Sequence, residues 1–182
     1  MRMVNRHLGA GILAVAAIAG SALATSASQA TAASYRCKTS SASIDTANYS
    51  GPTNDQWNVT TTLCAKRTGS SVYAYAKISW DGPVFMDVDN AAIFDSARFR
   101  LQVKRSQSGT DPVVVQRDYY AIESRLENSN SVGNYNGSYQ TPTVRWSAAG
   151  RSKAVVDGVL QLDWHRCCGG YKSHSFSASP VV

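Results

Sequence analysis

The stretch Arg98-Phe99-Arg100-Leu101-Gln102-Val103-Lys104-Arg105 decides the fold class of this chain. Its apolar residues recur at every second position, and polar or charged residues fill the positions between them. Successive side chains of a β-strand point to opposite faces, so this period of two predicts a strand with one buried and one outward face. The outward cations Arg98, Arg100 and Lys104 are interpreted as solvent cover, with a basic binding patch as the alternative.

The same alternation recurs on both sides of this stretch, with turn residues between the runs. Further strands are expected at 57–66, 72–80, 113–120, 143–147, 154–166 and 171–176. Four tryptophans at apolar positions of these runs are assigned to the core: Trp57, Trp80, Trp146 and Trp164. A helical period is almost absent, and the Asn-, Ser- and Gly-rich segment 123–140 is interpreted as the longest loop. Seven or eight such strands predict an all-β, two-layer antiparallel β-sandwich.

Residues 1–33 have the composition of a secretory signal peptide. Two arginines precede an apolar run from Leu8 to Ala24, and small residues follow up to Ala33. The run is shorter than the roughly 20 residues that a membrane span needs, so we expect cleavage near Ala33. Residues 34–182 then form a single secreted, extracellular domain that has no membrane attachment and begins with a polar segment, 34–52.

All four cysteines lie in the predicted mature part: Cys37, Cys64, Cys167 and Cys168. An even number in an exported protein indicates two disulfides rather than a metal site or a nucleophile. Because neighbouring residues of a strand point to opposite faces, we favour one bridge from Cys37 and one from Cys64, both to the adjacent pair. The alternative joins Cys37 to Cys64 and the adjacent cysteines to each other.

Composition and motifs argue against several classes of function. The 18 basic and 12 acidic residues are interleaved along the chain, whereas a nucleic-acid-binding protein concentrates its cations in a dense patch. No serine lies in a G-x-S-x-G motif, and no cofactor or catalytic activity is predicted. An enzyme or an enzyme inhibitor remains a third possibility, for which Asp163, His165 and His174 are the residues to test.

Two groups of potential metal ligands have simpler explanations, and no metal site is predicted. Asp163, His165 and Cys167 recur at every second position and are expected on one strand face, where a packed histidine beside a disulfide is the favoured interpretation. Asp87 and Asp89 lack the glycine and the distal glutamate of an EF-hand loop, so calcium binding is the alternative to a solvated turn.

Tyrosines provide the best candidate binding surfaces, because they give a large contact area at a low entropy cost. Partner binding is assigned to one tyrosine near the mature start and to residues of the long loop: Tyr35, Asn134, Tyr135, Asn136 and Tyr139. The polar segment 34–52 is expected to be an arm that adds to a partner's sheet or cleft. Tyr73 and Tyr75, on an outward strand face, would be the stacking platform of a carbohydrate-binding module, which is the alternative function.

Three stretches carry a resemblance to small secreted proteins of actinobacteria. They are Ala30-Thr31-Ala32-Ala33, Ser34-Tyr35-Arg36-Cys37 and Asp163-Trp164-His165-Arg166-Cys167-Cys168-Gly169-Gly170. The organisation is similar to the connector subunits of umbrella-type antibacterial toxin particles. This resemblance implies a β-sandwich adaptor between a lectin- or protease-like subunit and a repeat-containing toxin stalk. We therefore expect a non-catalytic interaction module whose partners are extracellular proteins, toxin-complex subunits among them.

Overall fold

A computed structural model describes residues 33–47, 55–83, 93–129, 136–148, 150 and 152–182 of the chain. Residues 32–182 form one compact unit. Residues 1–32 of the predicted signal peptide and the acidic turn at Asp87 and Asp89, for which calcium binding is the alternative interpretation, lie outside the described residues. Where the chain is described, none of its helices has the length and apolar character that a membrane span requires.

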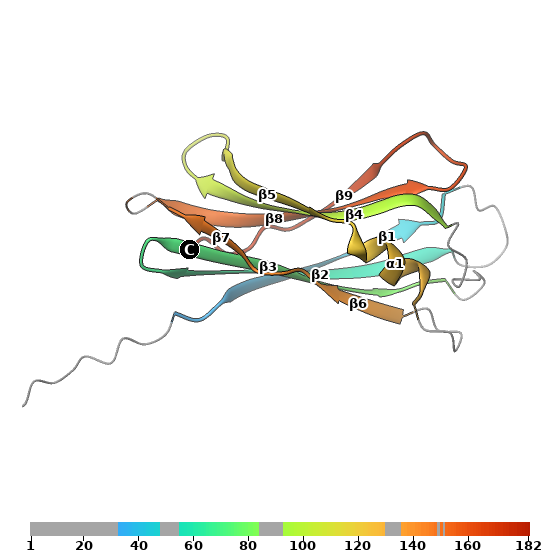
Figure 1. The fold of residues 1–182 in the computed structure, drawn as a ribbon, viewed down its shortest axis with the longest axis horizontal. Coiled ribbons are helices and arrows are strands. Elements are labelled where there is room, and N and C mark those ends of the chain that lie inside the picture. Colours follow the sequence, from blue (N-terminus) through green and yellow to red (C-terminus); the bar gives the residue numbers. More distant parts are fainter. Residues whose placement is uncertain (1–32, 48–54, 84–92, 130–135, 149, 151) are drawn as a thin grey trace, which may run out of the picture. The chain divides into compact units, whose positions relative to one another are not determined.

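The unit consists of two antiparallel sheets, which Figure 1 shows as two layers. Sheet A is formed by β1 (Arg36–Asp45), β2 (Gln56–Thr68), β3 (Ser71–Asp81), β6 (Asn136–Gln140) and β7 (Val144–Ser147). Its strand order is β1-β2-β3-β6, and β7 also pairs with β3. Sheet B contains β4 (Phe94–Ser106), β5 (Val113–Tyr119), β8 (Lys153–Trp164) and β9 (Lys172–Phe176), in the order β5-β4-β8-β9. The predicted two-layer antiparallel sandwich is confirmed.

The core lies between the inward faces of the two sheets. In β4 the buried residues alternate with partly exposed ones, as the period of two predicts, and Phe99 lies opposite Leu160 of β8. Phe94 links the two sheets, because its ring centroid lies 5.9 Å from that of Trp57 and 4.8 Å from that of Trp164. Trp80 is also buried, whereas Trp146 is half-buried against the core.

A short helix, α1 (Ala121–Glu127), follows β5 where the sequence predicts a loop. Ile122 and Leu126 are one turn apart and both buried, so the helix packs one apolar stripe against the core. The Glu123 carboxylate accepts a 2.9 Å hydrogen bond from the Ala97 backbone N–H, which ties the helix to β4. The expected loop at 123–140 is therefore wrong at both ends, since residues 136–140 form β6.

The disulfides join Cys37 to Cys64 and Cys167 to Cys168, so the favoured bridges between distant segments are wrong. Cys37 lies directly opposite Cys64 in the β1–β2 ladder, with a Cα–Cα distance of 4.1 Å. Cys167 and Cys168 follow the end of β8 in a turn, so the alternation of strand side chains does not apply to them. The first disulfide fastens the edge of sheet A, and the second closes a turn.

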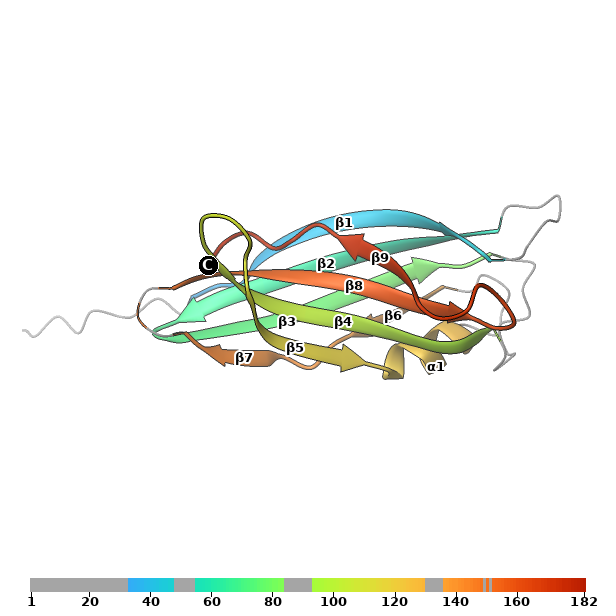
Figure 2. The same ribbon diagram turned by 90° about the horizontal axis from the view of Figure 1, so that it is seen from above.

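Residues 36–45 of the polar segment 34–52, which the sequence suggests as an arm that adds to a partner, form the edge strand of sheet A. β1 pairs with β2 without a break from Arg36↔Ala65 to Asp45↔Gln56. Hydroxyl groups join the two strands on the outward face, as between Thr39 and Thr62 at 2.8 Å. Figure 2 shows β1 along the outer margin of the sandwich.

The C-terminal residues complete sheet B beyond β9. The backbone N–H of Val182 donates to the carbonyl of Ala154, and the Ala154 N–H donates to the Val182 carbonyl, both at 2.9 Å. The Ser179 N–H makes a similar bond to Val156. The last residue of the chain is therefore hydrogen-bonded to β8.

Candidate functional site

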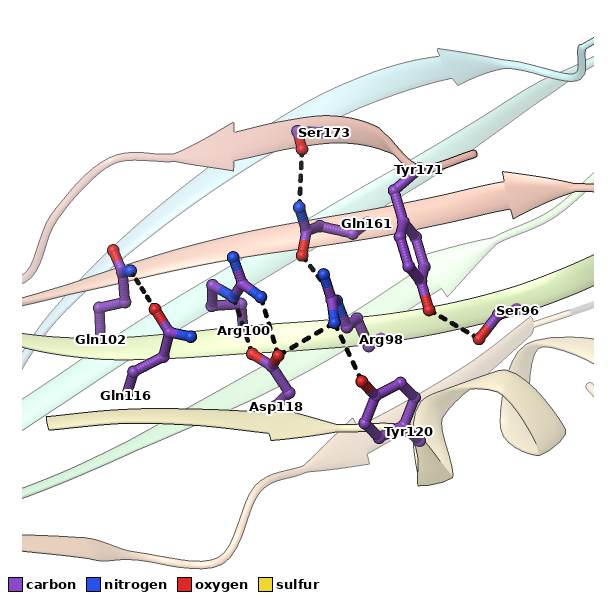
Figure 3. Close-up of polar contacts among 10 residues, drawn as sticks. All are labelled: Ser96, Arg98, Arg100, Gln102, Gln116, Asp118, Tyr120, Gln161, Tyr171 and Ser173. Carbon is purple, nitrogen blue, oxygen red and sulfur yellow. Dashed lines mark hydrogen bonds and ion pairs between the residues drawn. The ribbon is translucent and has the colours of Figure 1, made fainter. Parts of the chain in front are cut away.

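The outward face of sheet B carries a polar network centred on Arg98 and Asp118 (Figure 3). Arg98 donates to the Gln161 side chain at 2.8 Å and to the Tyr120 hydroxyl at 2.9 Å, and its Nη1 lies 3.1 Å from Asp118. Arg100 donates two hydrogen bonds of 2.8 Å to the same carboxylate. The Arg98 guanidinium also lies over the Tyr171 ring, 4.3 Å from its centroid.

Every cation of the basic stripe that the sequence shows on β4 has a carboxylate partner, and Arg98 and Arg100 share one, Asp118. The hydrogen bond with Arg100 holds the pKa of Asp118 below its ordinary value, and the same bond raises the pKa of Arg100. Lys104 forms its own ion pair with Asp157 at 2.5 Å. Because all three stripe cations are paired with carboxylates, we interpret the face as solvent cover whose ion pairs join β4 to β5 and β8.

A different surface lies on the outward face of sheet A, where five residues form what we term the tyrosine–cation patch: Tyr35, Lys66, Tyr73, Tyr75 and Arg145. The strand register places Lys66, Tyr73 and Arg145 in one row across β2, β3 and β7. Tyr75 lies opposite Cys64, and Tyr35 immediately precedes β1. The patch thus unites a predicted partner-binding residue, Tyr35, with the predicted sugar-stacking residues Tyr73 and Tyr75.

The rings and cations of the patch contact one another closely. Tyr35 packs edge-on against Tyr75 with ring centroids 4.9 Å apart. The Lys66 ammonium lies 4.6 Å from the Tyr35 centroid and 5.7 Å from that of Tyr73, and the Arg145 guanidinium lies 6.0 Å from the latter. Such cation–π contacts hold the cations at the surface of the rings without neutralising their charge.

The cations of the patch differ from those of sheet B in their electrostatic surroundings. Arg145 donates to the Ser71 hydroxyl at 3.0 and 2.8 Å, which fixes its position with a neutral partner. In the described part of the chain, neither Lys66 nor Arg145 forms an ion pair with a carboxylate. The patch therefore presents net positive charge between aromatic side chains.

The other predicted partner-binding residues are not gathered at this patch. Asn136 pairs with Asp81, at the end of β3 that is farther from the patch. It lies beside an open hollow of about 410 Å³. The hollow is lined by polar groups and one indole: Asn58, Thr60, Ser79, Trp80, Asp81, Asn136 and Gly137. Tyr139 packs against the core, where burial raises the pKa of its hydroxyl. Asn134 and Tyr135 lie outside the described residues.

The histidines are placed differently from the sequence-based expectation. His165 and Cys167 lie beyond the end of β8, and the partner of His165 is Asp95, whose Oδ1 is 2.6 Å from its Nδ1. Asp163 instead accepts a hydrogen bond from the Gly170 backbone N–H at 3.1 Å. His174 is half-buried on β9, and burial lowers its pKa. Among the described residues, no group of three or more His, Cys, Asp or Glu side chains is arranged to hold a metal ion.

Comparison with models of known protein families and with curated proteins found no match to this chain. Its candidate function follows from the residues themselves, above all from the tyrosine–cation patch. Lys66 and Arg145 were not among the predicted site residues. The alternation of 72–80 indicates that Tyr73 and Tyr75 share an outward face, but only the pairing of β3 with β2 and β7 brings the two cations beside them.

Proposed function

We propose that this protein is a secreted, non-catalytic interaction module that binds an acidic surface of an extracellular partner protein through the tyrosine–cation patch. The observation that carries this proposal is the position of Lys66 and Arg145 among three tyrosines, with no carboxylate of the described residues paired to either cation. Tyrosine and arginine are enriched in protein interfaces and supply much of their binding energy. Unneutralised cations favour a partner of opposite charge.

The geometry favours a protein partner over a neutral sugar. Stacking of a sugar ring requires an open aromatic face. Lys66 lies over the rings of Tyr35 and Tyr73, and the edge contact with Tyr35 takes up part of the surface of Tyr75. The patch is therefore better suited to ion pairs with carboxylates than to a flat stacking contact.

Several features support a role without catalysis. All four cysteines form disulfides, which leaves no thiol as a nucleophile. The lowered pKa of His174 follows from burial rather than from a charged neighbour. A subunit of an extracellular toxin complex is the partner that the resemblance to connector subunits suggests, and it enters the proposal on that basis.

Affinity purification from the native culture supernatant tests the proposal. The protein carries a tag on a flexible linker after Val182 and is compared with the double variant Lys66→Glu/Arg145→Glu. We expect the wild type to recover a stoichiometric protein partner and the variant to bind it at least about tenfold more weakly, which corresponds to about 1.4 kcal/mol. The matched control is Arg117→Glu/Lys172→Glu, which makes the same change in net charge at exposed positions of sheet B.

The control is expected to bind as the wild type does, because it leaves the patch intact. Equal losses of affinity in both double variants would show that binding depends only on net charge, which would contradict a specific role of the patch. Recovery of no protein partner would count against an adaptor. Retention on chitin, cellulose or peptidoglycan that is lost in Tyr73→Ala or Tyr75→Ala would favour the carbohydrate-binding alternative.

A further inference from the structure

One margin of sheet A is formed by β1, whose backbone groups alternate in direction. The Cα atoms of Cys37 and Cys64 are 4.1 Å apart, the short spacing of an antiparallel pair that is not joined by backbone hydrogen bonds. The ladder alternates from this pair onward. Cys37, Thr39, Ser41, Ser43 and Asp45 therefore direct their backbone N–H and C=O groups away from β2.

These outward backbone groups have no strand beside them in the described part of the chain. The C-terminal segment approaches β1 only through side chains: the Ser177 N–H donates to the Ser40 hydroxyl at 3.0 Å, and Arg36 donates to the Val181 carbonyl at 2.8 Å. No backbone hydrogen bond from sheet B to β1 is present among the described residues. Figure 2 shows β1 running along the margin of the sandwich.

The middle of the edge lacks the features that usually prevent pairing between sheet edges. Proteins protect such edges with proline, bulges, charged side chains or short strands, and the charges of β1 lie only at its two ends. β1 has ten residues, contains no proline, and pairs with β2 without a register shift. Its outward hydroxyls are turned toward β2, as in the 2.8 Å bond between Ser41 and Thr60. A second strand can therefore approach along most of its length.

Charge is distributed unevenly along this edge and specifies the direction of an incoming strand. Arg36 and Lys38 lie at the beginning of β1, whereas Asp45 lies at its end, with Asp55 nearby just before β2. A strand with the same order of charges meets opposite charges only if it runs antiparallel. β1 of another copy has this order.

We propose that β1 pairs antiparallel with β1 of a second copy of this chain, around a two-fold axis near Ser41. In this register Ser41 faces its own counterpart, Thr39 faces Ser43, and Cys37 faces Asp45. All of these residues direct their backbone groups toward the partner strand, so the two copies of sheet A become one continuous sheet. The pairing uses the backbone margin of the sheet, whereas Lys66, Tyr73, Tyr75 and Arg145 lie on its face, so this proposal does not rest on the proposed binding function.

Sedimentation and light scattering of the purified protein, from about 1 µM to about 500 µM, measure this association over a range in which a modest edge contact dissociates. We expect a reversible monomer–dimer equilibrium that weakens with added salt, because salt screens the contacts between opposite charges. Amide hydrogen exchange gives a residue-specific test. The N–H groups of Thr39, Ser41 and Ser43 should become protected as the concentration rises, while those of Ser40 and Ala42, already bonded to β2, should not change.

Ser41→Pro is the decisive variant. It removes an N–H that points away from β2, so the ladder within the sheet is retained while two hydrogen bonds across the axis are lost. We expect a dissociation constant raised at least about 30-fold, with an unchanged near-UV spectrum. Ser41→Ala keeps the N–H and should dimerise as the wild type does. A wild type that stays monomeric at all concentrations, or a dimer that Ser41→Pro leaves intact, would overturn the proposal.

Discussion

Replacement of Gly158 by alanine tests how closely the two sheets are packed. Gly158 lies in the middle of β8, and a Cβ atom at this position would lie 2.6 Å from Cζ of Phe99 and 2.9 Å from Cδ2 of Leu63. Both neighbours are completely buried, so neither side chain has free space to enter. Alanine in place of a strand glycine would by itself stabilise by about 0.5–1 kcal/mol, whereas overpacking of a core costs about 1–3 kcal/mol. We therefore expect Gly158→Ala to lower the free energy of unfolding by about 1–2 kcal/mol.

Urea unfolding followed by tryptophan fluorescence measures this change. If the slope of the free energy of unfolding against urea concentration is the same in both proteins, the denatured state is unchanged. Phe99→Leu removes the ring that blocks the new methyl group. The loss in the free energy of unfolding of the double variant should therefore be smaller than the sum of the two single losses by at least about 0.5 kcal/mol. A Gly158→Ala variant that is more stable than the wild type, or strictly additive effects in the cycle, would refute the close packing of Phe99 and Leu63 around Gly158.

Two further predictions concern pH and the disulfides. Burial lowers the pKa of His174 below its ordinary 6.5, so its stabilising contribution is complete above that pH and is lost as the pH falls through the lowered pKa. We expect the melting temperature of the wild type to fall between about pH 7 and pH 5, and that of His174→Gln to fall less. Identical pH profiles of the two proteins would contradict this. The Cys37–Cys64 disulfide spans 27 residues, so its replacement by two alanines should cost about 3–4 kcal/mol. Replacement of Cys167 and Cys168 by serines should cost less than about 1 kcal/mol, because that bridge closes no loop between distant residues; equal costs in chemical unfolding would contradict the connectivity.

The fold class could be predicted from the sequence because the alternation in β4 and β3 is a local property of the chain. Phe99 and Leu101 are buried while Arg98 and Arg100 face outward, as a period of two requires. The helix α1 was not predicted because its two turns contain only one pair of buried apolar residues at helical spacing, Ile122 and Leu126. So short a pattern is easily missed beside an Asn- and Ser-rich segment.

The disulfide pairing and the tyrosine–cation patch could not be predicted because both depend on strand register. Cys37 meets Cys64 only because β1 pairs with β2 in one particular register, which is not set by a tight two-residue turn. Lys66 and Arg145 are far apart in sequence and become neighbours of Tyr73 through two separate strand pairings. A sequence pattern shows which face a side chain occupies but not which residue lies beside it.

The central place of β8 in sheet B has a consequence for the timing of folding during synthesis. β8 pairs with β4 on one side and with β9 on the other, and β4 lies far earlier in the sequence. Sheet B therefore cannot assemble until β8 has left the ribosome or the translocation channel. Until then β4 lacks one of its two neighbouring strands, and its unpaired edge is open to contacts that lead to aggregation.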